Sequence, residues 1–345
     1  MIARAKSIGL IAAVLSLLAP AMAHGTLAFV KNPLKPVVYV AANGGSKQKR
    51  VGIGTEPKVS PDGDEVAYLR PGKDPLGRPQ MELMLATVSG AIPPRLLAGE
   101  MESLAAFAWS PDSDMIATAK VDEEGRQWLT LIDLVRNVQR TVAKGYFGGV
   151  SFSPDGERLV YAKARRDRFP FRGDVFRADV LGGKPVALTR DHRSLEPLWG
   201  PSGRIVFVKQ LGAGNRRFGP KNELFLMNGE GRAVRRLTRT DVDPLLLGLT
   251  PVDWSADGRR LLAEFVGQDT SYAVAVNART GKQRPLTRDF ESGFSGAALS
   301  ADGRFVLGAT GGFEPGPDHD VARVPFGGGK PRILVRNAFL PDWSR

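Results

Sequence analysis

The sequence predicts an all-β protein built from internal repeats. Three observations support this: a strand and turn recur along the chain, the strands are short with alternating hydrophobicity between Gly or Pro residues, and no helical periodicity interrupts them. The turn is of the Ser-Pro-Asp-Gly type. Its copies are KVSPDGDEVAYL (Lys58 to Leu69), AWSPDSDMIATA (Ala108 to Ala119), SFSPDGERLVYA (Ser151 to Ala162), LWGPSGRIVFV (Leu198 to Val208), DWSADGRRLLAEF (Asp253 to Phe265), ALSADGRFVLGA (Ala298 to Ala309) and PDWSR (Pro341 to Arg345).

The spacing of the copies indicates the architecture. The positions that begin the turns are 50, 43, 47, 55, 45 and 44 residues apart; they are Ser60, Ser110, Ser153, Gly200, Ser255, Ser300 and Ser344. A period of this length is typical of one four-stranded blade of a β-propeller. The sequence therefore predicts a ring of four-stranded blades.

The elements of one unit follow in a fixed order. The first strand leads into the turn, in which Pro sets φ, Asp caps the turn and Gly takes the positive φ. A second strand such as Leu159 to Tyr161 precedes an insertion of variable length. A third strand such as Leu224 to Met227 then leads through a Gly-rich turn (Asn228 to Gly231) to a fourth strand ending in Arg236-Leu237-Thr238.

The two ends of the chain predict one further blade. Leu27 to Val30, Val37 to Val40 and Lys47 to Val51 read as second, third and fourth strands without a first. Ala338 to Ser344 reads as a first strand without the other three. Joining them removes free sheet edges, so we expect seven four-stranded blades with ring closure by the N- and C-terminal strands. The alternative is six blades, with the N-terminal half-unit outside the ring.

The repeats resemble those of the TolB-like propellers, a WD-repeat-like family whose units carry a Trp/Phe-Ser-Pro-Asp-Gly core. Trp109 to Asp112, Phe152 to Gly156 and Trp254 to Gly258 match that core best. The resemblance covers the whole mature chain and implies a propeller fold, which in that family serves binding scaffolds and the non-catalytic domains of peptidases. TolB itself has a separate N-terminal domain, whereas only a short strand-rich stretch precedes the first repeat here.

Residues 1–23 have the composition of a signal peptide. Arg4 and Lys6 precede an apolar stretch, Ile8 to Ala19, which is too short to span a bilayer, and Ala21-Met22-Ala23 offers a cleavage site. We therefore expect residues 24–345 to form a single domain with no transmembrane segment, located in the periplasm or secreted. The chain has no Cys, which excludes disulfides and a lipidated cysteine.

The charge of the chain bears on its partners. Removing the signal takes away two basic residues and no acidic ones, so the net charge falls from +12 to +10. Export and the lack of a recognised motif argue against nucleic acid, so we expect a protein or an anionic envelope polymer as partner of a monomer. The alternative is an evenly solvated basic surface.

Two insertions form the first candidate site, because propeller function resides in variable loops. They belong to neighbouring units and interleave Arg with Phe169, Phe171 and Phe218, so we expect them side by side at the rim. Guanidinium groups there would bind carboxylate or phosphate. The alternative is a pair of solvated loops. The candidate ligand-binding residues are Arg165, Arg166, Arg168, Arg172, Arg216 and Arg217.

The connections between units form the second candidate site, because they lie near the mouth of the central channel. Carboxylates converging there could hold Ca²⁺ or a basic peptide. The alternative is that they cap turns and pair with Arg190, Arg239 and Arg288. The candidates are Asp191, His192, Glu196, Asp241, Asp243, Asp289 and Glu291.

The sequence offers little for catalysis. It has no Cys nucleophile, and its imidazoles are limited to His24, His192 and His319, too few for a His-ligated metal centre. Gly293 to Ala297 resembles a nucleophile elbow but lies between strands and ends in Ala. We therefore predict a non-catalytic binding scaffold with no catalytic or metal-binding residues. The alternative is a hydrolase or lyase acting on envelope saccharide or peptide, using Asp241 or Glu291 with His192.

Overall fold

The computed structural model describes residues 25–73, 76–101, 107–121, 126–164, 172–212, 220–240, 247–267, 271–287, 293–311 and 318–344. These residues form β-strands in five sheets and contain no helix. The export signal predicted for residues 1–23 lies outside them. Within the described part of the chain, no helix is long and apolar enough to cross a membrane.

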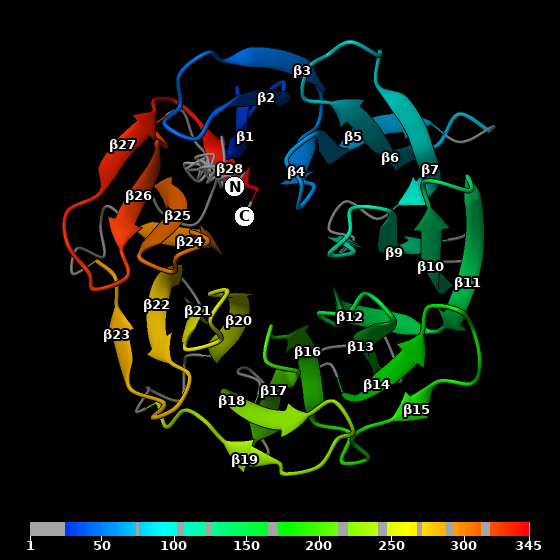
Figure 1. Ribbon diagram of the computed structural model, residues 1–345, viewed down its shortest axis with the longest axis vertical. Coiled ribbons are helices and arrows are strands. Elements are labelled where there is room, and N and C mark those ends of the chain that lie inside the picture. Colours follow the sequence, from blue (N-terminus) through cyan, green and yellow to red (C-terminus); the bar gives the residue numbers. More distant parts are fainter. Residues whose placement is uncertain are drawn as a thin grey trace, which may run out of the picture.

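The strands are arranged as consecutive sets of four around a central axis (Figure 1). One sheet has the order β28-β1-β2-β3, made of Phe339–Trp343, Thr26–Lys31, Val37–Ala42 and Lys49–Ile53. A second combines β4 (Thr55–Val59), β5 (Glu65–Lys73), β6 (Pro79–Thr87) and β7 (Arg95–Met101) with β8 (Phe107–Trp109), β9 (Met115–Val121), β10 (Gln127–Asp133) and β11 (Val138–Lys144).

The remaining sheets continue the same pattern. The third has the order β12 (Tyr146–Phe152), β13 (Arg158–Ala164), β14 (Gly173–Asp179), β15 (Val186–Ala187). The fourth combines β16 (Ser194–Trp199), β17 (Arg204–Leu211), β18 (Lys221–Asn228) and β19 (Arg235–Arg236) with β20 (Gly248–Trp254), β21 (Arg260–Val266), β22 (Ser271–Asn277) and β23 (Gln283–Pro285). The fifth is β24 (Phe294–Leu299), β25 (Phe305–Thr310), β26 (Val321–Pro325), β27 (Arg332–Val335).

Each eight-stranded sheet consists of two sets of four strands, which are joined in the hydrogen-bonded sheet by a single residue pair. Met101 on β7 pairs with Lys120 on β9, and Asn222 on β18 pairs in parallel with Gly248 on β20. Within the sets, neighbouring strands are antiparallel, as in the register Val206↔Leu226 of β17 and β18. In Figure 1, β4, β12, β16, β20, β24 and β28 lie toward the centre, and β3, β7, β11, β15, β19, β23 and β27 lie at the periphery.

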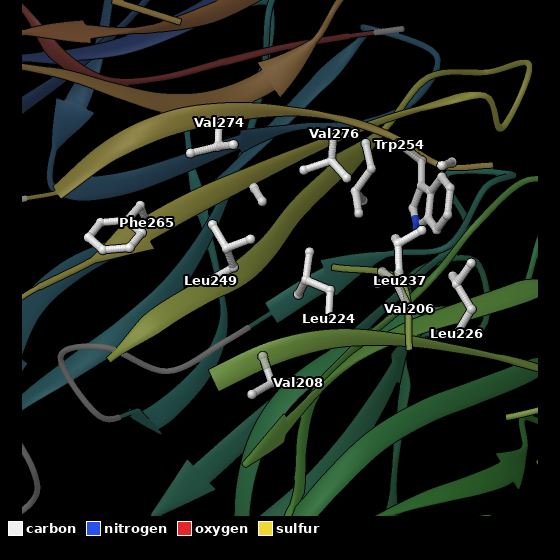
Figure 2. Packing of buried hydrophobic residues seen from close by; sticks show 13 residues of the cluster. Val206, Val208, Leu224, Leu226, Leu237, Leu249, Trp254, Phe265, Val274 and Val276 are labelled. Carbon is white, nitrogen blue, oxygen red and sulfur yellow. The ribbon is translucent and has the colours of Figure 1, made fainter. Parts of the chain in front are cut away.

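The hydrophobic core lies between successive sets of strands. Figure 2 shows one part of it, where Val206 and Leu224 of one set meet Leu249 and Val274 of the next. A cluster containing Leu27, Phe29 and Trp343 packs against Ala298, Leu307 and Val321, so the first and last strands share a core. The second strand of a set is covered on both faces, which explains its nearly continuous apolar sequence.

The Ser-Asp turns are closed by side-chain hydrogen bonds. Ser60 Oγ donates to Asp62 Oδ1 (2.6 Å) and accepts from the backbone N of Glu65 (2.9 Å), and Asp62 Oδ1 also accepts from the backbone N of Asp64 (3.1 Å). Gly63 has φ 84°, and the same position of another copy is occupied by Ser113 with φ 66°. The Asp residues of these turns therefore maintain turn geometry, as the sequence predicts.

Candidate functional site

The most distinctive site lies in the connection from β15 to β16, where His192 meets Asp174. Asp174 is buried at the start of β14 and accepts from the backbone N of His192 (2.9 Å) and from Thr189 Oγ1 (3.2 Å). Its second oxygen lies 2.5 Å from His192 Nδ1, while the His192 side chain is 43% exposed. A carboxylate that holds Nδ1 orients the ring and leaves Nε2 as the nitrogen for proton transfer, as in His-based acid–base sites.

The acid at the Asp174 position recurs in other units. Glu223 on β18 accepts from Thr238 Oγ1 (2.6 Å) and from the backbone N of Thr240 (2.8 Å). Asp320, next to β26, accepts from the backbone N of Asn337 (2.9 Å). These acids fasten the connection that leaves each fourth strand, so the position has a structural role. Asp174 contacts an imidazole nitrogen, whereas Glu223 bonds to Thr238, Thr240 and Arg236.

Asp191, predicted at the channel mouth, is held by its own surroundings. Its carboxylate accepts from the backbone N of Arg193 (3.0 Å) and from Ser194 Oγ (2.9 Å), and Lys209 Nζ lies 2.8 Å away. Burial acts to raise the pKa of Asp191, but the hydrogen bonds from these groups outweigh it and the pKa is lowered. The ion-pair partner is thus Lys209 on β17 and not the adjacent Arg190.

Glu196 occupies a β-bulge in β16. The register with β17 shifts between Leu195 and Leu198, and Glu196 has φ 45° immediately before Pro197. Its carboxylate packs against β12, where a Cβ on Gly148 would lie 2.9 Å from Glu196 Oε1. Burial raises the pKa of Glu196, and no hydrogen bond or ion pair joins its carboxylate to another described residue. The same bulge with positive φ recurs at Glu56 in β4 and Leu340 in β28, each before Pro.

Most of the remaining predicted site residues lie outside the described residues: Arg165, Arg166, Arg168, Arg216, Arg217, Asp241, Asp243, Asp289 and Glu291. Arg172 is described and exposed. Among the described residues, no three His, Asp or Glu side chains come together as metal ligands. The calcium site at the channel mouth therefore stays a prediction.

Two partly buried carboxyls were not singled out by sequence reasoning. Glu264 on β21 accepts from Ser271 Oγ and from the backbone N of Gly296 (3.2 Å), and burial raises its pKa to about 7. Asp342 on β28 accepts from the backbone N of Val59 (2.7 Å), and burial raises its pKa to about 6. Asp253 makes the equivalent bond to Leu299 N (2.6 Å). An Asp directly before the Trp of a repeat is the sequence signal for this link between sets of strands.

Comparison with known proteins gives structural likeness alone. No family model matches the chain, and no curated protein matches it. The crystal structure of TolB from Acinetobacter baumannii superposes with a TM-score of 0.53 and 17% identity, covering 93% of this chain and 83% of that one. The β-propeller domain of the Trilobed protease from Pyrococcus furiosus gives a TM-score of 0.64 with 12% identity, covering 91% and 93%.

The fold is that of a β-propeller, as in TolB. This confirms the propeller fold that the repeats predict. The Trilobed protease propeller is described as having an open velcro topology, whereas here β28 pairs with β1. Oligogalacturonate lyase in complex with manganese is a further neighbour, with a TM-score of 0.59, 17% identity and coverage of 91% of this chain and 86% of that one. Because such different proteins share this likeness, it supports the propeller fold and does not indicate a function.

Proposed function

We propose that this propeller is an exported, non-catalytic binding scaffold of the periplasm or cell envelope. Its partner is a protein or an anionic envelope polymer, and its partner surface is the face that carries the Arg-rich insertions. We further infer that residues 24–345 form one monomeric domain after removal of a signal peptide. The composition of residues 1–23 and the net charge of the mature chain support export and an anionic partner.

One observation carries this proposal: the two sets of strands from which the Arg-rich insertions emerge pack directly against each other. Val160 and Val175 of the first set share a buried cluster with Ile205, Phe207 and Met227 of the second. Each insertion follows the second strand of its set, after Ala164 on β13 and after Leu211 on β17. The insertions therefore begin from equivalent positions of adjacent sets.

We also infer a propeller of seven blades in which the sheet β28-β1-β2-β3 is the closing one. The strand order of that sheet and the core shared by Trp343 and Leu307 support this count. The alternative of six blades would leave β1, β2 and β3 outside the ring. The pairing of β1 with β28 favours seven.

The test of the scaffold is binding of envelope extract to immobilised mature protein at low and at high salt. We expect binding that falls steeply with salt, because exposed charge pairs are screened over about 8 Å at physiological ionic strength. Replacing Arg165, Arg166, Arg216 and Arg217 with Ser should abolish it. A matched variant with Lys35, Lys47, Arg50 and Lys73 replaced by Ser changes the charge equally on exposed residues elsewhere. Equal retention by both variants would exclude the insertions as the partner surface.

A hydrolase or lyase acting on envelope saccharide or peptide is the second candidate, favoured by the His192–Asp174 pair. In that function His192 Nε2 would transfer the proton, with Asp174 fixing the ring through Nδ1. Turnover of cell-wall fragments by the parent, lost in His192→Gln and reduced in Asp174→Asn, would support it. Turnover unchanged in His192→Gln would exclude this site.

A further inference from the structure

A basic groove lies at the periphery between β19 and the β22–β23 turn, two elements that Figure 1 places on adjacent sets of strands. Its volume is about 530 Å³. Arg235, Arg239 and Thr240 line it from one set, and Thr280, Lys282 and Gln283 line it from the next. None of its lining residues belongs to the Arg-rich insertions or to the His192 site.

Close backbone contact shapes the groove. Gly281 in the β22–β23 turn has φ 74°, and a Cβ there would lie 1.8 Å from the backbone O of Leu237. Only Gly lets the turn approach the neighbouring strand this closely. Thr240 Oγ1 and Gln283 Oε1 lie 2.9 Å apart across the boundary between these two sets of strands. The backbone segments that carry the lining residues are therefore held in close contact.

Arg236 also lines the groove and pairs with Glu223, whereas the other three cations of the groove have no acidic partner among the described residues. Arg235, Arg239 and Lys282 are exposed, and the guanidinium of Arg235 donates only to the backbone O of Ala278 (3.4 Å). The nearby Glu223 does not neutralise them, since it is fully buried and pairs with Arg236 (3.0 Å) and Lys221 (3.3 Å). Three positive charges thus line one small space.

The same boundary in the preceding unit carries fewer cations. There Gly231 approaches the backbone O of Leu188, with a Cβ distance of 3.0 Å, so the backbone arrangement is shared. The positions equivalent to Arg235, Arg239 and Lys282 hold Val186, Arg190 and Arg232. A basic side chain two residues after the Leu is therefore part of the repeat, and the preceding boundary has two of the three cations found at the boundary at Gly281.

We propose that this groove binds a phosphate group carried by a ligand of the cell envelope. A carboxylate brings a single negative charge, whereas a phosphate monoester brings about −1.5 to −2 and three acceptor oxygens. Two guanidinium groups and an ammonium supply planar and point-charge donors for those oxygens. Thr240, Thr280 and Gln283 add neutral polar groups to the lining. The site adds a second ligand to the scaffold and does not depend on the insertions.

The test uses two probes that share the phosphate chemistry. Pyrophosphate is titrated calorimetrically into the full mature protein. In a flotation assay, vesicles containing phosphatidic acid, whose headgroup is a phosphate monoester, are compared with vesicles of phosphatidylcholine, whose zwitterionic headgroup has no net charge. We expect binding of at least one phosphate probe, with no binding to phosphatidylcholine. Binding of pyrophosphate alone indicates a soluble phosphate ligand, and binding of phosphatidic acid vesicles alone indicates a lipid headgroup. Binding of neither probe overturns the proposal.

Variants locate the binding. Replacing Arg235, Arg239 and Lys282 with Ser should weaken it at least about tenfold, the loss of roughly one charge-assisted hydrogen bond. The control replaces Lys184, Arg190 and Arg232 with Ser, which removes the same charge beside the preceding boundary and should leave affinity within about twofold. Equal weakening in both variants, or none in the first, overturns the assignment. Equal melting temperatures of the variants and parent verify that each is folded. Because Arg165, Arg166, Arg216 and Arg217 stay intact in these variants, failure here leaves the insertion-face proposal standing.

Discussion

At the level of single residues, the turn of each repeat shows how far side-chain chemistry can be read from sequence. The role of Asp in the turn was predictable, because its short carboxylate caps the backbone two residues on. The role of the preceding Ser was not predicted, since its hydroxyl bonds to a backbone N five residues away, as in Ser255 to Arg260 (3.0 Å). That bond exists only once the strands are paired.

Replacing the buried Ser255 with Ala should therefore destabilise the protein by roughly 1–3 kcal/mol, because a buried N–H loses its acceptor. Urea unfolding measures the change. Ser46→Ala, an exposed Ser whose hydroxyl makes no bond to a described residue, should stay within about 0.5 kcal/mol. A Ser255→Ala variant as stable as Ser46→Ala would show that the hydroxyl is not needed to close the turn.

The partly buried Glu264 predicts a pH dependence of stability. Burial raises its pKa from 4.5 to about 7, so the folded protein holds the proton more tightly than the unfolded chain. Stability from this group is therefore present below pH about 4.5 and is lost as the pH rises toward about 7. The loss is on the order of 3 kcal/mol, at about 1.4 kcal/mol for each pKa unit.

Glu264→Gln should be more stable than the parent at neutral pH and should show a smaller decline between acid and neutral pH. Urea unfolding across that range measures the difference. Part of the decline in stability should remain in Glu264→Gln, because the pKa of Asp342 is also raised, to about 6. Glu157→Gln, at an exposed position, is the control. Identical slopes for the parent and Glu264→Gln would mean that Glu264 does not titrate in the folded protein.

The His192 site was predictable only in part. Its position in a connection between units, among titratable groups, could be read from the sequence. Its partner Asp174 could not, because it lies 18 residues earlier and reaches His192 only through the folding of β14 and β15 into one set. Without knowledge of that strand register, the sequence does not distinguish Asp174 from the other acidic residues as the partner of His192.

At the level of elements, the order of strands within a unit was predictable and the irregularities of the inner strands were not. Turn residues and period locate the four strands, because each has a local chemical signal. The bulges at Glu56, Glu196 and Leu340 require positive φ in residues that rarely adopt it, and only the Pro that follows each hints at a break in pairing. Their side chains are directed by this backbone rather than by strand alternation.

The pairing of β28 with β1 predicts a large effect of C-terminal truncation. Deleting residues 338–345 removes the buried Phe339 and Trp343 and leaves β1 unpaired on one side. We expect a loss of at least about 3 kcal/mol and a lower melting temperature. Deleting Arg345 alone is the control. A melting temperature unchanged by the longer deletion would rule out a structural role for β28.

At the level of the whole molecule, periodicity predicted the ring-like arrangement because every unit repeats the same local chemistry. The clustering of basic side chains from different units could not be predicted in the same way. Arg235, Arg239 and Lys282 come from two units and are separated in the sequence by the whole of β20, β21 and β22. They become neighbours because the β22–β23 turn packs against the chain around Leu237, through the contact at Gly281 and the bond between Thr240 and Gln283.

The predicted signal peptide concerns the export of the whole chain and gives a test of where the mature protein begins. Ala21 and Ala23 have the small side chains that signal peptidase requires, so the mature protein should begin at His24. Intact-mass measurement of protein from the periplasm or medium tests this. As a control, Ala23→Phe should block cleavage, because a bulky residue does not fit that position. A mature product that retains residues 1–23 would refute both the cleavage site and the exported location.

The sheet β28-β1-β2-β3 has a consequence for the order of events in biosynthesis. Thr26 and Ser344, bonded through the backbone N of the first and Oγ of the second, are 318 residues apart. While the chain is still emerging, Leu27 to Val30 therefore present an apolar strand edge that has no partner. That edge must be kept from other chains until β28 has been made, so we expect a chaperone to occupy it during synthesis and translocation.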